Sequence, residues 1–127
     1  MKIKRLDPPR SFEVGRGEKV LINDCARINL APNEQVTFVS DAGAEYDVAR
    51  KDWGFYATPS TNSRLRKFGW RSALVRSPSG QYYVFLLESG KDAEFHRYLK
   101  LESHRVICWL DDDADLNRIT DIFSSDR

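Results

Sequence analysis

The sequence predicts a mainly β protein at the margin of α+β, built as an antiparallel β-sandwich or partly open barrel with one or two helices in its C-terminal third. Three observations predict this class. Short β-branched and aliphatic runs recur through the first half between turn-forming residues, residues 70–87 form the clearest hairpin pattern, and the hydrophobic period changes from two to helical after Gly90. A chain of 127 residues is expected to form a single globular domain spanning residues 1–127.

The first half is expected to contain short strands separated by turns. Pro8 and Pro9 should interrupt the first run, and Asn23 and Asp24 should divide two later ones. A hairpin turn is predicted at residues 41–44 (DAGA). The strands are expected at residues 2–5, 11–14, 19–22, 27–30, 35–40, 45–49 and 53–57.

The middle of the chain contains the strongest strand signal. Residues 70–76 and 81–87 flank the turn-forming tetrapeptide SPSG at residues 77–80, which predicts that the two runs pair. Nearly every residue from Tyr82 to Leu87 is apolar, a pattern typical of a central strand buried on both faces. Residues 64–68 are ambiguous, since Leu65 and Phe68 are three apart and would suit one helical turn.

The last third is predicted to form a helix, a strand and a second helix. Four residues lie at helical spacing and predict a helix over residues 91–102, with Ser89 or Asp92 as its cap: Phe95, Tyr98, Leu99 and Glu102. Residues 105–110 should form a strand. The triple aspartate of residues 111–113 is expected to cap a second helix marked by Leu116, Ile119 and Phe123, although it could instead bind a divalent cation.

Charge is balanced overall and uneven locally. The chain has 20 bases and 19 acids, which gives no general attraction to nucleic acid or to a membrane. Residues 50–76 carry seven cations against one acid, whereas residues 111–127 carry six aspartates and two arginines. No apolar run approaches the roughly 18 residues of a membrane span, and no signal peptide is recognisable, so a cytoplasmic location is expected.

Metal, cofactor and catalytic residues are not indicated. His96, His104 and Cys108 would come from different elements, and zinc requires three or four converging ligands. No Gly-rich phosphate loop or nucleophile motif is present. Cys25 and Cys108 are expected to be free and mostly buried.

The basic and aromatic stretch after Arg50 is the candidate site. Cations, hydroxyls and rings together suit a phosphate- or sugar-bearing ligand, although each ring could equally belong to the core and the cations could pair with the acidic end. The expected partner is an anionic small molecule or an acidic protein surface. The candidate ligand-binding residues are Trp53, Tyr56, Thr58, Ser60, Asn62, Arg64, Arg66, Lys67, Trp70 and Arg71.

The string DWGFYATPSTNSRLRKFGW, residues 52–70, resembles a motif in small uncharacterised bacterial proteins. The similarity extends over residues 12–109. Genes for these proteins often lie beside genes for surface-polysaccharide and nucleotide-sugar synthesis. The resemblance implies a role in cell-envelope glycan assembly and supplies no catalytic residue.

Three functions are consistent with the sequence. The first is a non-catalytic binding or accessory protein with a basic and aromatic site for an anionic sugar, nucleotide or protein surface. The second is a small metal-independent sugar-modifying enzyme, which a deep pocket with an isolated carboxylate would favour. The third is a nucleic-acid-binding module, which the balanced charge disfavours.

Overall fold

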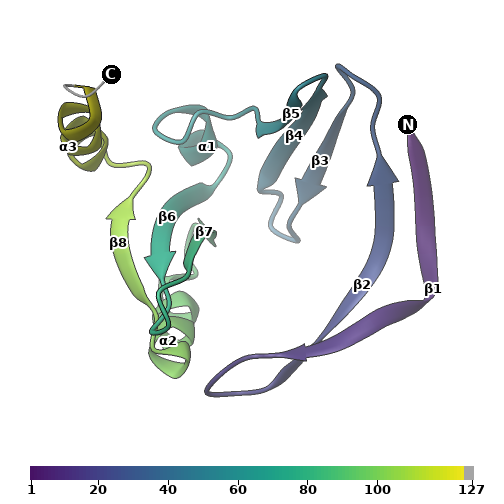
Figure 1. Cartoon of the computed structure of the whole chain (residues 1–127), viewed down its shortest axis with the longest axis horizontal. Helices are drawn as coiled ribbons and strands as arrows, with labels where there is room; N and C mark the ends of the chain where they lie inside the picture. The colour runs from purple at the N-terminus through teal and green to yellow at the C-terminus, as the bar shows by residue number, and fades with distance from the viewer. Residues whose placement is uncertain (125–127) are drawn as a thin grey trace.

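The computed structural model describes residues 1–124, and these residues are mainly β, with 47% in strands and 22% in helices. The predicted class is confirmed. The strands form three small antiparallel sheets, a helix ends the described chain, and the described residues contain no closed barrel (Figure 1).

The first sheet is a long hairpin of β1 (Lys2–Val14) and β2 (Val20–Asn29), so the expectation of several short strands is wrong. Pro8 and Pro9 lie where the pairing register shifts between Arg5 and Arg10, so their missing N–H groups interrupt no regular ladder bond. Asn23 does not divide the strand, because its side chain accepts a hydrogen bond from Ser11 Oγ at 2.7 Å.

The hairpin reaches from the second sheet to the third (Figure 1). At its tip, the Arg16 backbone N–H donates to Glu102 Oε2 at 2.5 Å. A Cβ on Gly17 would lie 2.1 Å from the carbonyl oxygen of Leu101. The tip can approach that backbone only with glycine at this position.

The second sheet is a three-stranded meander with β4 in the centre. The turn predicted at residues 41–44 is confirmed, and Val36 pairs with Val48 and Phe38 with Tyr46 in the register that the alternation predicts. The strands are β3 (Gln35–Val39), β4 (Glu45–Lys51) and β5 (Gly54–Ala57).

The third sheet has the order β7-β6-β8. The hairpin of β6 (Trp70–Arg76) and β7 (Tyr82–Glu88) is confirmed. The expectation that β7 is central is wrong: β6 is central because β8 (Arg105–Trp109) pairs with its other edge. Tyr82 and Val84 of the edge strand β7 are therefore exposed, Val84 by 61%.

The three helices lie where the sequence predicts a helix or a helical turn, but one predicted helix cap is wrong. Asp112 caps the last helix as expected, since its Oδ1 accepts from the Ala114 N–H at 2.8 Å. The capping of the middle helix by Ser89 or Asp92 is wrong, because Lys91 is the N-cap and makes no side-chain cap bond. The helices are α1 (Arg64–Lys67), α2 (Asp92–Glu102) and α3 (Asp113–Ser124). No described helix is long and apolar enough to cross a membrane.

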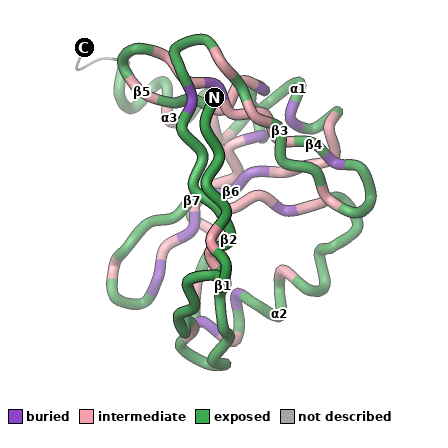
Figure 2. Tube along the Cα trace, turned by 90° about the vertical axis from the view of Figure 1, so that its right-hand side faces the viewer, coloured by how far each residue is buried: buried purple, intermediate pink, exposed green. Residues whose placement is uncertain are grey.

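The hydrophobic core is small and lies between the third sheet and α2. It centres on Ala73, Val75 and Leu99, with half-buried aromatic and aliphatic residues packed around them. No aromatic side chain in residues 1–124 is fully buried. Figure 2 shows how little of the chain is buried: the buried segments are short, and the β1–β2 hairpin is exposed over almost its whole length.

Both cysteines are free, as expected, but the burial prediction is wrong for Cys25. Cys25 is exposed because it lies on the β1–β2 hairpin, which contributes nothing to the core. Cys108 on β8 is half-buried, and burial raises the pKa of its thiol.

Candidate functional site

The aromatic members of the predicted site do not gather in one place. Trp53 and Tyr56 stack on each other near β5, with centroids 5.9 Å apart, and both rings are largely exposed. Trp70 instead joins two sheets, because its Nε1 donates to the carbonyl oxygen of Glu45 at 2.9 Å. The rings therefore form no shared platform with Trp70.

The polar residues before α1 serve that helix. Ser60 Oγ accepts from the Arg64 N–H at 3.2 Å, and Arg64 Nη2 donates to Thr58 Oγ1 at 3.2 Å. Asn62 Nδ2 donates to Asp113 Oδ1 at 3.0 Å. These contacts use Thr58, Ser60 and Asn62 to fix the loop.

The arginines of the predicted site are paired with acids. Arg71 donates through Nε and Nη2 to the two carboxylate oxygens of Asp111, at 2.9 and 3.3 Å. Arg66 lies 3.8 Å from the same carboxylate, and Arg64 lies 3.9 Å from Asp47. The alternative that the basic stretch pairs with the acidic end is therefore confirmed for Arg66 and Arg71.

Asp111 is the centre of this network and is only 1% exposed. The pKa of Arg71 is raised, and the largest cause is the hydrogen bonding of its guanidinium to the Asp111 carboxylate. The Arg71 guanidinium also lies 3.8 Å from the ring centroid of Trp109. Both a carboxylate and a ring therefore hold Arg71. Of the cations in the predicted set, only Lys67 lies outside every ion pair of residues 1–124, and it is exposed.

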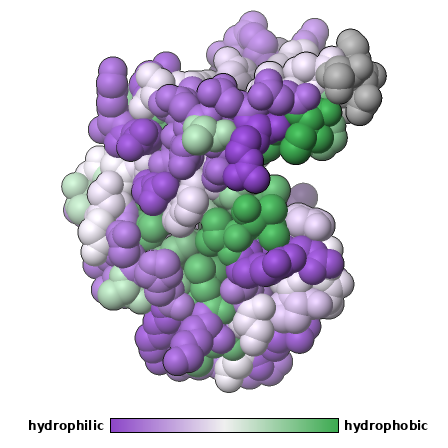
Figure 3. Space-filling view, turned by 90° about the vertical axis from the view of Figure 1, so that its left-hand side faces the viewer, coloured by the Kyte–Doolittle hydropathy of each residue, from purple (hydrophilic) through white to green (hydrophobic). Residues whose placement is uncertain are grey.

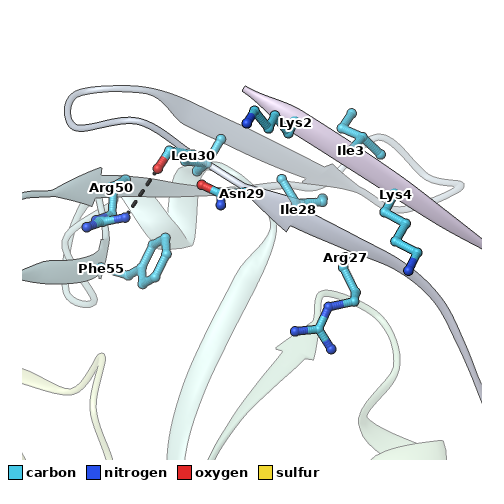
Figure 4. A pocket seen from close by; sticks show the side chains of 9 residues that line it. All are labelled: Lys2, Ile3, Lys4, Arg27, Ile28, Asn29, Leu30, Arg50 and Phe55. Atoms are coloured by element: carbon cyan, nitrogen blue, oxygen red, sulfur yellow. Dashed lines mark hydrogen bonds between the residues drawn. The ribbon is translucent and has the colours of Figure 1, made fainter.

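A different group of cations surrounds an open hollow at the base of the hairpin (Figure 4). The hollow has a volume of about 650 Å³ and lies between the β1–β2 hairpin and the β4–β5 strands. Its lining contains no acidic side chain. We call it the basic hollow, and it is lined by Lys2, Ile3, Lys4, Arg27, Ile28, Asn29, Leu30, Arg50 and Phe55.

The hairpin register concentrates positive charge in the basic hollow. Lys4 and Arg27 are directly opposite each other on neighbouring strands, and Lys2 is opposite Asn29. Like charges at such a cross-strand position destabilise the pair. None of the ion pairs in residues 1–124 involves Lys2, Lys4 or Arg27. An anion bound between these side chains would relieve the repulsion.

Arg50 forms the opposite side of the basic hollow and is held rigidly. Its Nε donates to the carbonyl oxygen of Lys51 at 2.6 Å, and its Nη1 donates to that of Leu30 at 3.2 Å (Figure 4). Its guanidinium lies 5.5 Å from the centroid of the Phe55 ring. Two carbonyl groups and a ring therefore orient the guanidinium in advance of any ligand.

Sequence reasoning missed the basic hollow because its four cations come from three separate stretches. Lys2 and Lys4 share one face of an alternating strand, which the sequence does show. Arg27 joins them only through the register of the long hairpin, which was expected to be several short strands. Arg50 and Phe55 belong to the basic and aromatic stretch but were not among the candidate residues.

A second cavity, of about 380 Å³, lies where the hairpin tip meets β7 and α2. Its aromatic lining includes Tyr83, Phe85, Tyr98 and His104, whose rings stack or meet edge to face. Glu102 is only 6% exposed and contributes a carboxylate. Burial, and then the Glu102 charge, raise the pKa of Tyr98. We call this cavity the tip cleft.

Residues 1–124 contain no cluster of three or more His, Cys, Asp or Glu side chains placed to hold a metal ion. Comparison with protein-family models, curated proteins and solved structures found no match to this chain.

Proposed function

We propose that this chain is a binding protein for a phosphate-bearing small molecule, of the nucleotide or nucleotide-sugar class, and that the basic hollow is its site. The observation that carries the proposal is the set of four cations around one hollow whose lining holds no acid. Three of them, Lys2, Lys4 and Arg27, have no ion pair within the described part of the chain.

The chemistry of the basic hollow fits such a ligand. Arg50 and Arg27 can each give two N–H groups to a phosphate, while Lys2 and Lys4 act as mobile point charges. Leu30 and Phe55 supply apolar contact for a base or a sugar ring, whereas Ile3 and Ile28 alternate onto the other face of the hairpin. A volume near 650 Å³ is within the range of small-molecule sites. An accessory role in surface-polysaccharide synthesis, where nucleotide sugars are the donors, is consistent with this ligand class.

A thermal-shift panel tests the proposal. Nucleoside diphosphates and nucleotide sugars should raise the Tm, and the matching uncharged nucleosides should not. A ligand at 100 times its Kd stabilises the folded state by about 2.7 kcal/mol, which is a shift of several degrees. The shift should shrink as salt rises from 0.05 to about 0.5 M, because exposed charges are screened. Equal shifts from charged and uncharged nucleosides would contradict an anion site.

A second candidate function, a metal-independent sugar-modifying enzyme, is favoured by one observation. Glu102 is an isolated and nearly buried carboxylate in a cleft whose lining is rich in aromatic rings. Rings can pack against a sugar, and a carboxylate can serve as a general acid or base. One Glu102 oxygen is already occupied by the Arg16 N–H, which leaves Oε1 for a substrate.

Mass spectrometry separates the two functions. If the tip cleft is catalytic, a nucleotide-sugar panel incubated with the protein should yield a changed sugar, and Glu102→Gln should reduce the rate by about 100-fold or more. The same variant should leave binding at the basic hollow unchanged, since the two sites share no lining residue. Recovery of every sugar unchanged would remove the enzymatic candidate.

A further inference from the structure

The folded chain exposes far more surface than a compact monomer of its size. Its accessible surface is 9361 Å² at a mass of 14.7 kDa. The scaling for compact monomers gives about 6,900 Å² at this mass, so the excess is about 2,400 Å². An obligate dimer buries roughly 1,000 to 2,500 Å² on each subunit. The excess is comparable in size to the area that one subunit of such a dimer hides.

The outer part of the hairpin carries one exposed apolar face. Phe12 pairs with Ile22 and Val14 pairs with Val20, which places four large apolar side chains on one face. All four are exposed, Val20 by 47%. A two-stranded hairpin is marginally stable in water on its own, so this face is expected to be covered.

A second apolar surface lies across the tip cleft from this face. Val14 and Val20 line the cleft on the hairpin side, and Tyr83 lines it on the side of β7. β7 is an edge strand that also exposes Tyr82 and Val84. Unpaired edges with apolar side chains are templates for pairing with another chain. Figure 3 shows the opposite side of the molecule, away from the hairpin, where apolar side chains gather in a separate hollow.

We propose that the occupant is a second copy of this chain, and that two copies associate through the Phe12, Val14, Val20 and Ile22 face of the hairpin together with the β7 edge. Residues 7–24 carry four acids and three bases, so their charge is nearly balanced and two hairpins meet with little repulsion. A two-fold contact uses the same patch on both subunits, as most homodimers do. The basic hollow lies at the other end of the hairpin and stays open.

Sedimentation equilibrium of the wild-type chain provides the first test. The account predicts a mass of twice 14.7 kDa at micromolar concentration. A mass of 14.7 kDa at every concentration up to about 100 µM would overturn it and would leave a different protein as the occupant.

A matched pair of variants provides the second test. Phe12→Asp with Ile22→Asp should raise the Kd of the dimer by about 100-fold or more, because central apolar residues dominate interface energies. Val39→Asp changes an exposed valine on β3, which is 64% exposed against 41% for Phe12 and 42% for Ile22, and should leave the dimer intact. A dimer that survives the double substitution would contradict the proposed face.

Hydrogen exchange of the wild-type chain keeps the proposal testable should the double variant fail to fold. Amides of residues 10–24 should be protected at high concentration and lose protection on dilution, as the dimer dissociates. Fast exchange of these amides at every concentration would contradict a covered hairpin.

Discussion

Replacing Asp111 with alanine is expected to lower the free energy of unfolding by about 3 kcal/mol. Breaking a buried ion pair by removing one partner typically costs 3 to 5 kcal/mol. The lower end applies because Arg71 is 41% exposed and retains water, and because it also packs on the Trp109 ring. Urea denaturation followed by far-UV circular dichroism measures the loss.

The control for Asp111→Ala is Asp121→Ala on α3. Asp121 is exposed and belongs to none of the ion pairs in residues 1–124, so its removal should change stability by no more than about 0.5 kcal/mol. Arg71→Met combined with Asp111→Ala should cost less than the two single changes added together, since the pair is removed as a unit. Additive losses would show that the ion pair is not the stabilising contact.

Replacing Leu65 with alanine is expected to cost about 3 kcal/mol and to disorder the loop before α1. Leu65 is 1% exposed and is the only buried residue of the four-residue α1, which contacts β6. Deleting a buried leucine side chain to alanine costs roughly 2 to 5 kcal/mol. The helix is too short to persist without this anchor.

Two measurements check the Leu65 prediction. Urea denaturation gives the stability change, and hydrogen exchange of residues 58–69 reports the loop. Leu65→Met should cost less than about 1.5 kcal/mol, because it nearly conserves volume. A loop that stays protected in Leu65→Ala would mean that the Asp111 and Asp47 ion pairs, rather than the leucine, hold α1 in place.

Local signals in the sequence predicted most of the element types. The pairing of β6 with β7 follows from the SPSG turn and the flanking apolar runs, and α2 follows from the spacing of Phe95, Tyr98 and Leu99. These features depend on residues close in the chain, where turn chemistry and periodicity decide the outcome.

The errors occurred where partners are distant in sequence. β7 reads as a central strand because it is apolar, yet the pairing of β6 with β8 makes it an edge. Pro8 and Pro9 read as a break, yet a register shift accommodates them. One candidate residue has a partner for the same reason: Arg71 appeared available in the sequence, yet it bonds Asp111, which lies 40 residues away.

The basic hollow could not be found from composition alone. The sequence shows a strong cation excess in residues 50–76, but the structure satisfies much of it internally. The cations without ion pairs are spread thinly along the hairpin and become a cluster only through its register. Local charge density therefore does not show which cations lie outside ion pairs in residues 1–124.

Isothermal titration with a nucleoside diphosphate, applied to two triple variants, tests the basic hollow most directly. Lys2→Gln, Lys4→Gln, Arg27→Gln should weaken binding by about 1,000-fold or more, since each of the three lost charge-assisted contacts costs roughly 1.5 to 3 kcal/mol. Arg64→Gln, Arg66→Gln, Lys67→Gln removes equal charge elsewhere and should bind within about threefold of the wild type while melting earlier. If the second triple loses binding and the first retains it, the basic hollow is not the site.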